Sequence, residues 1–281
     1  MSLNKKEDGK IDPKAWEIGT MTDFLKDVSA ESLKACRAAG IQCVELFFDG
    51  RGANSAEEVI EKHSMDAFYI RKSGLKLWSV HLPFGTKWDV STKNDQLREN
   101  AVKKMCTLVE QASRWEAQIA VIHASWEPVK ESERAERMLN AENSLKLIAK
   151  KAKECNMRLA VECLPRTCLG NCSTELLKLI KHENTFVCMD TNHLLREAQS
   201  DFISKLGDKI ITLHVSDYDG VDERHWLPGK GIINWKEVIA ELNNVGYKGP
   251  FMFEVNRTFK KEVYEAKDLV DSWNKIVENL K

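Results

Sequence analysis

The sequence predicts an α/β fold of the (β/α)8 TIM barrel class, and two observations support that prediction. Short apolar runs rich in Val, Ile, Leu and Phe alternate with longer amphipathic stretches along the chain. This alternation is typical of a parallel sheet with helices between its strands. The chain has 281 residues, so eight such units would average about 35 residues each, which matches the usual size of a (β/α)8 barrel.

Eight segments are expected to form the strands, because each is a short apolar run bounded by polar or turn-forming residues. In chain order they are Trp16–Gly19, Ile41–Leu46, Leu75–His81, Ile119–His123, Arg158–Glu162, Phe186–Asp190, Ile210–His214 and Phe251–Glu254. Before the fourth strand, apolar residues recur at helical spacing from Leu97 to Ala112. Ser173 and Asn234 are expected to cap the helices that follow the fifth and seventh strands.

The composition is that of an ordinary globular protein. Lys and Arg number 42 against 43 Asp and Glu, whereas nucleic-acid and anionic-membrane binders usually carry a basic excess. The eight cysteines are too sparse for a disulfide scaffold. A cytoplasmic protein with no nucleic-acid or membrane partner is therefore expected. No linker divides the chain, so residues 13–281 are expected to form one domain after a disordered polar leader, residues 1–12.

Six consecutive strands, from the third to the eighth, end in a residue that can carry acid–base or metal chemistry. These residues are His81, His123, Glu162, Asp190, His214 and Glu254. A single histidine or carboxylate after a strand is more often a hydrogen-bonded structural group. In a barrel of this class, however, the carboxyl ends of the strands form the active site, so six successive matches favour a functional site at one mouth.

Three of these residues are carboxylates, which would repel one another at a shared mouth unless a cation compensates them. A divalent metal held by Glu162, Asp190, Glu254 and His214 is the simplest compensation. Three carboxylates and one imidazole suit Mn²⁺ or Mg²⁺. Further histidines near the mouth would let Zn²⁺, Co²⁺ or Fe²⁺ compete, so the metal stays open.

The strand ends carry Glu162, then Asp190-x-x-His193, then His214, then Glu254. This order resembles the xylose isomerase-like barrel superfamily, and within it the sugar phosphate isomerase/epimerase group. Shorter stretches agree, namely Val80-His81-Leu82-Pro83-Phe84, Met189-Asp190-Thr191-Asn192-His193, Leu213-His214-Val215-Ser216-Asp217 and Pro228-Gly229-Lys230-Gly231-Ile232-Ile233-Asn234-Trp235. The resemblance spans roughly residues 75–260 and is specific for the superfamily rather than for a substrate.

The resemblance to ketose 3-epimerases of this superfamily implies the same four metal ligands and a small-molecule carbohydrate substrate. The metal would chelate a carbonyl and an adjacent hydroxyl of an open-chain sugar, which acidifies the neighbouring C–H. A carboxylate then removes that proton to give an enediolate. Return of the proton to the opposite face is epimerisation, and return to the neighbouring carbon is isomerisation. Glu162 and Glu254 are the expected acid–base pair, and His193 is expected to orient a substrate oxygen.

Substrate contacts are expected from the loops that follow the strands. Trp126 and Trp226 follow the fourth and seventh strands, where an indole face can stack on the C–H face of a sugar. Arg166 can bind a hydroxyl, a carboxylate or a phosphate, or else pair with a carboxylate of the rim. In the 3-epimerases an arginine that contacts substrate closely follows the seventh-strand histidine. Here that stretch reads Ser216-Asp217-Tyr218-Asp219-Gly220, and Arg224 is the expected replacement.

Endonuclease IV belongs to the same superfamily, and the chain also resembles its ligands for three zinc ions. The three sets are His81, His123 and Glu162; Asp190, His214 and Glu254; and His193, Glu223 and His225. A metal-dependent phosphoesterase therefore stays open, although Glu223 replaces an Asp of that family and the neutral charge argues against DNA binding. A keto-sugar lyase and a non-catalytic sugar-binding barrel are further alternatives. Barrels of this group often pair, so a homodimer is an additional expectation.

Overall fold

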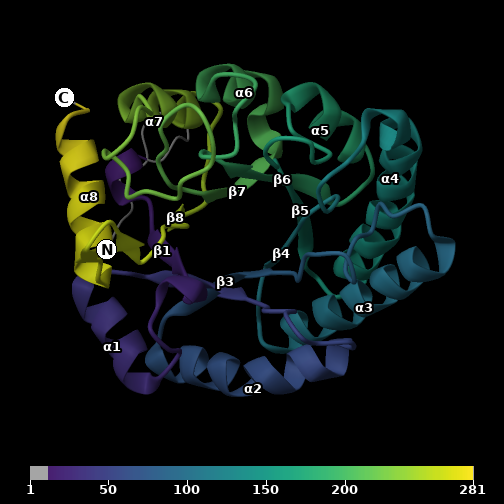
Figure 1. The fold of residues 1–281 in the computed structure, drawn as a ribbon. Coiled ribbons are helices and arrows are strands. Elements are labelled where there is room, and N and C mark those ends of the chain that lie inside the picture. Colours follow the sequence, from purple (N-terminus) through teal and green to yellow (C-terminus); the bar gives the residue numbers. More distant parts are fainter. Residues whose placement is uncertain (1–11, 281) are drawn as a thin grey trace.

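Eight parallel strands form a barrel surrounded by helices in a computed structural model that describes residues 12–280 (Figure 1). The strands are β1 (Ile18–Met21), β2 (Cys43–Phe47), β3 (Lys76–His81), β4 (Ile119–Ile122), β5 (Arg158–Glu162), β6 (Thr185–Asp190), β7 (Ile210–His214) and β8 (Phe251–Phe253). Each strand from β1 to β6 pairs with the next, and β1 also pairs with β8. Val215 bonds the backbone of both Met252 and Glu254 and so joins the β7 end to β8. The predicted (β/α)8 barrel is confirmed.

Helices connect the strands and cover the outside of the barrel. They are α1 (Ala30–Ala39), α2 (Ala56–Ser73), α3 (Asp95–Arg114), α4 (Glu131–Glu154), α5 (Ser173–Leu179), α6 (Gln199–Leu206), α7 (Trp235–Asn244) and α8 (Ala266–Glu278). Short 3-10 turns lie at Pro13–Ala15, Thr22–Phe24 and Gly207–Lys209, and β9 (Thr258–Phe259) and β10 (Glu262–Val263) form a separate hairpin. Asn234 caps α7 as predicted. Ser173 instead begins α5, and its hydroxyl bonds Glu197.

The expected strands coincide with the observed ones to within two residues at each end. The first begins at Ile18 rather than Trp16, because Pro13 starts a 3-10 turn and the N–H of Trp16 bonds the Pro13 carbonyl. The expected apolar face of α3 also begins late. Leu97 is 52% exposed, since side chains in the first turn of a helix tilt toward its start and away from the packed turns.

Two layers of apolar side chains make up the core. The larger one lies between the strands and the helices. The smaller one fills the barrel interior and consists of Cys43, Trp78, Ile119, Val121, Ala160, Cys188 and Met252. The interior is tight: a Cβ on Gly19 would lie 2.7 Å from the Met252 methyl and 2.8 Å from Cys43 Sγ. The residues at the mouth therefore rest on a solid apolar floor.

Most of the expected leader, residues 1–11, lies outside the described residues. Its last residue, Asp12, caps the 3-10 turn at Pro13–Ala15 by accepting a hydrogen bond from the Lys14 N–H. Between residues 12 and 280, no helix combines the length and the apolar character needed to cross a membrane. The division into a leader and one domain stays a prediction.

Candidate metal centre

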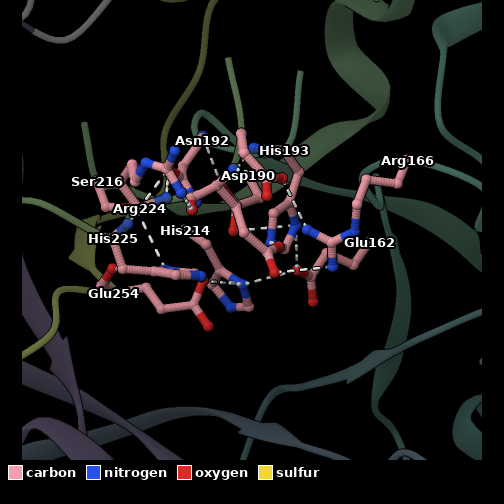
Figure 2. Close-up of polar contacts among 12 residues, drawn as sticks. Glu162, Arg166, Asp190, Asn192, His193, His214, Ser216, Arg224, His225 and Glu254 are labelled. Carbon is pink, nitrogen blue, oxygen red and sulfur yellow. Dashed lines mark hydrogen bonds and ion pairs between the residues drawn. The ribbon is translucent and has the colours of Figure 1, made fainter. Parts of the chain in front are cut away.

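Four predicted side chains meet at the carboxyl end of the barrel (Figure 2). Glu162, Asp190 and His214 are the last residues of β5, β6 and β7, and Glu254 directly follows β8. The parallel register sets Asp190 opposite His214, which brings side chains from separate strands to one level. One ligand atom from each of the four residues lies within 4.8 Å of those of the other three. The fold thus assembles three carboxylates and one imidazole at a single point.

Each of these four residues contributes one buried atom that lacks a hydrogen-bond partner. The atoms are Glu162 Oε1, Asp190 Oδ2, His214 Nδ1 and Glu254 Oε2. An unsatisfied buried polar atom costs about 1–3 kcal/mol, so four of them at one point call for a shared partner. His214 Nδ1 lies 3.2 Å from Glu254 Oε2 and 3.5 Å from Glu162 Oε1. Mostly oxygen donors with one imidazole fit a hard divalent cation.

The carboxylates of this cluster differ in their protonation chemistry. Burial raises the pKa of Asp190 well above its ordinary value, and the nearby Glu254 adds to the rise although His193 opposes it. Burial also disfavours ionisation of Glu162, but His123 and His214 outweigh that effect and lower the pKa of Glu162 well below its ordinary value. The pKa of Glu254 is likewise lowered, because His214 outweighs the effect of burial. Glu162 and Glu254 are thus held in their charged forms.

Three more predicted histidines surround Glu162. Its Oε2 lies 3.1 Å from His81 Nε2 and 3.2 Å from His123 Nε2. Its Oε1 lies 3.2 Å from His193 Nδ1. His193 Nε2 lies 3.1 Å from Glu223 Oε2. Two further groups whose atoms are close enough to share an ion are His81, Glu162 and His214, and His193, Glu223 and His225. The structure therefore brings together the additional residues that the sequence singled out.

The loop that carries Glu223 and His225 is held by two buried polar side chains. Asp217 accepts hydrogen bonds from three backbone N–H groups, at Tyr218, Gly229 and Ile233, and from the indole N–H of Trp235. Asn192 Oδ1 accepts the backbone N–H groups of Arg224 at 2.7 Å and His225 at 3.3 Å. These contacts fix the backbone on both sides of Glu223, so its carboxylate and the His225 ring are presented to the mouth.

A cavity of about 180 Å³ opens onto this cluster. Its aromatic wall is formed by Phe84, which stacks on Trp126 at 5.6 Å and on His123 at 4.5 Å between ring centroids. Trp126 therefore lies where a stacking residue is expected. The wall offers a flat apolar face opposite the polar ligand cluster, an arrangement typical of small-molecule sites with a few convergent polar groups.

The three remaining predicted substrate contacts behave differently. Arg166 lines the cavity, but it pairs with rim carboxylates, as the alternative interpretation had it: Glu127, Asp222 and Glu223 all accept hydrogen bonds from its guanidinium. Arg224 and Trp226 are not among the residues that line this cavity. The Arg224 Nε donates to Asp219 at 2.7 Å, and the Trp226 ring packs on Phe259 of β9.

A profile of the xylose isomerase-like TIM barrel family matches residues 33–276 of this chain. The chain belongs to this family. An uncharacterized protein of Methanocaldococcus jannaschii is 26% identical over 83% of this chain and 88% of its own length. Fructoselysine 3-epimerase of Escherichia coli O157:H7 is 28% identical over 34% of this chain and 35% of that enzyme. D-psicose 3-epimerase of Enterocloster bolteae is 28% identical over 50% and 48%, respectively. The matches to these two enzymes thus span less than half of their length.

Solved structures agree on the fold of this family member. A D-tagatose 3-epimerase-like protein superposes with a TM-score of 0.77 at 21% identity, over 94% of this chain and 98% of the other. D-psicose 3-epimerase from Clostridium cellulolyticum H10, solved with D-tagatose, gives a TM-score of 0.74 at 17% identity over the same shares. The resemblance to the superfamily predicted from the strand-end residues is confirmed.

Two acidic residues of this barrel at the mouth were missed by the sequence interpretation. Glu45 on β2 is fully buried, and its Oε1 lies 2.8 Å from His214 Nε2. Asp23, just after β1, has an exposed side chain. Its pKa is nevertheless raised to about 6, first because the protein around the carboxylate reduces its solvation and then because Glu254 is nearby. Glu45 is a single charged residue inside the apolar run Cys43–Phe47. This pattern could have revealed it, because a charged side chain is buried only where it is paired or hydrogen-bonded.

Proposed function

We propose that this protein is a divalent-metal-dependent sugar isomerase or epimerase that moves a proton through an enediolate. The observation that carries the proposal is the cluster of four buried ligand atoms on Glu162, Asp190, His214 and Glu254, none of which makes a hydrogen bond. Several relatives are sugar epimerases by name, fructoselysine 3-epimerase and D-psicose 3-epimerase among them, which supports a sugar as substrate. Mn²⁺ or Mg²⁺ is the proposed ion because three of the four ligands are carboxylates.

The four residues would hold the ion, whose chemistry is to polarise a carbonyl group and acidify the C–H beside it. Glu162 ends β5 and Glu254 follows β8, and their lowered pKa values keep both carboxylates ionised. One would remove the proton and the other would return it. The His193 ring lies between Glu162 and Glu223, and it would bind a hydroxyl of the sugar in place of one of these contacts.

The rim favours an uncharged sugar over a phosphorylated one. Arg166 is the one cationic side chain among the described residues that line the cavity, apart from histidines, and three carboxylates already neutralise it. A phosphate would meet the charges of Glu127 and Glu223 without a free guanidinium to bind it. The wall of Phe84 and Trp126 can instead cover the C–H face of a neutral sugar chain.

A metal-dependent phosphoesterase is the second candidate. It is favoured by one observation, namely that His193, Glu223 and His225 form a further group able to hold an ion beside the first. Two or three neighbouring ions are typical of enzymes that hydrolyse phosphate esters. The paired state of Arg166 weighs against it, because this cation is not free to contact a phosphate backbone.

Deuterium exchange distinguishes these functions. The purified protein is stripped with a chelator, reloaded with Mn²⁺, Mg²⁺, Co²⁺ or Zn²⁺, and incubated in D₂O with a panel of free ketoses. We expect deuterium to enter the carbon beside the carbonyl only in the metal-loaded protein. Metal binding without exchange but with cleavage of an abasic oligonucleotide would support the phosphoesterase. Loss of a substituent during exchange would indicate a lyase, and neither metal nor exchange would leave a sugar-binding barrel.

A further inference from the structure

A buried carboxylate lies behind the candidate metal centre. Glu45 is the third residue of β2, and strand alternation sets it on the interior face of the barrel with Cys43. Its Oε1 lies 2.8 Å from His214 Nε2. Its Oε2 accepts a hydrogen bond of 2.5 Å from Ser79 Oγ on β3. All three side chains are fully buried, so no water competes for these contacts.

The two nitrogens of the His214 ring face different surroundings. Nε2 points at the carboxylate of Glu45, whereas Nδ1 faces the ligand cluster, 3.2 Å from Glu254 Oε2, and makes no hydrogen bond. A carboxylate is an acceptor only, so the contact with Glu45 requires a proton on Nε2. A ring that keeps its proton on Nε2 presents a lone pair on Nδ1, which is the form that binds a cation.

The opposite tautomer would place two acceptors against each other. With its proton on Nδ1, the ring would turn a lone pair on Nε2 toward the Glu45 carboxylate at 2.8 Å. The N–H would then face the cation site. Glu45 cannot easily rotate away from this contact, because the Ser79 hydroxyl holds its other oxygen in place. Packing alone cannot make this choice, since the two tautomers have the same shape.

We propose that Glu45 is a positioning residue that fixes the tautomer and the orientation of His214 for metal binding, with Ser79 fixing Glu45 in turn. The role rests on the proposed function, in which His214 Nδ1 is a metal ligand. Residues that orient a ligating histidine in this way usually change metal affinity by about 10–100-fold when replaced. Glu45→Gln keeps the size of the side chain and removes its charge, so a loss within that range is expected.

The test measures Zn²⁺ and Mn²⁺ affinity by competition with a chromophoric chelator for wild type, Glu45→Gln, Ser79→Ala and the control Glu99→Gln, whose site is exposed on α3. Glu45→Gln is expected to weaken both metals, Ser79→Ala to weaken them less, and the control to match wild type. Long-range ¹H–¹⁵N spectra of the Zn²⁺-loaded proteins report the ring of His214 directly. A proton on Nε2 is expected in wild type, with a mixture of tautomers in Glu45→Gln.

Equal affinity and an unchanged His214 spectrum in Glu45→Gln would overturn the positioning role. If Glu45→Gln does not fold, Ser79→Ala is the deciding variant. Unchanged metal affinity together with an unchanged His214 spectrum in Ser79→Ala would also overturn the positioning role. Failure of the wild type to bind either metal would instead refute the proposed function, which separates the two conclusions. The thermal midpoint of the metal-free variants identifies a purely structural effect, since such an effect would lower the midpoint without changing the tautomer.

Discussion

The guanidinium of Arg166 lies 2.9 Å from the carboxylate of Glu223 across the barrel mouth, measured from Nη2 to Oε1. The other oxygen of Glu223 lies 3.1 Å from His193 Nε2. One carboxylate therefore connects the rim to the ligand cluster, and hydrogen bonds from His193 and Arg166 lower its pKa to about 2 despite partial burial. A change in the charges around Arg166 is therefore expected to affect, through Glu223, the position of His193 in the ligand cluster.

Freeing Arg166 is expected to change substrate choice. In the double variant Glu127→Gln and Asp222→Asn, the guanidinium keeps only Glu223 as a charged partner. The ratio of kcat/KM for a ketose phosphate to that for the free ketose is expected to rise about tenfold, which corresponds to about 1.4 kcal/mol. Steady-state assays with matched pairs of substrates measure it. A ratio that stays at the wild-type value would show that the paired rim does not exclude phosphate.

Glu254→Gln is expected to abolish deuterium exchange into ketoses while the barrel stays folded. The amide cannot accept the proton, and loss of a general base typically costs about 10²–10⁴-fold in rate. Exchange is followed by NMR in D₂O, with circular dichroism to verify folding and Glu99→Gln as the surface control. Exchange at the wild-type rate in Glu254→Gln would remove Glu254 from the mechanism.

Asp190→Asn is expected to leave the metal-free protein at least as stable as wild type but to remove its response to metal. Burial and the nearby Glu254 disfavour the charged form of Asp190, and an amide oxygen can still accept the N–H groups of Asn192 and His193. In wild type, Mn²⁺ at a hundredfold excess over Kd should add about 2.7 kcal/mol of stability. Scanning calorimetry with and without Mn²⁺ measures both effects. An equal metal-induced rise in the variant would exclude Asp190 as a ligand.

Gly231→Ala is expected to disturb the loop that presents Glu223 and His225. The added Cβ would lie 2.2 Å from the Tyr218 carbonyl oxygen and 2.3 Å from Asp217 Oδ1, so the loop must shift. Overpacking of this kind typically costs about 1–3 kcal/mol, and activity should fall further than stability. Ile232→Ala in the same loop is the control, because Ile232 is 65% exposed. Activity and a thermal midpoint equal to those of the control would contradict this view of the loop.

Much of the fold could be predicted because its determinants are local. Short apolar runs mark the strands of a parallel barrel. The stretches between them, in which apolar residues recur at helical spacing, mark its helices. Parallel strands then bring their carboxyl ends to one mouth, so Glu162, Asp190 and His214 could be placed together before any distance was known. The error at Leu97 and the cap at Ser173 arose where local patterns compete with the packing of neighbouring segments.

The amino-acid sequence alone determined the barrel and the residue types gathered at its mouth, since both follow from periodicity and from where each strand ends. Only the tertiary structure decided how those residues pair. The contact of Glu45 with His214 crosses the barrel interior, and Arg166 pairs with Glu127 and Asp222 from other loops. Such choices depend on distances of a few ångströms between segments far apart in the chain, and hydrogen bonds and ion pairs form only when the folded backbone sets those distances.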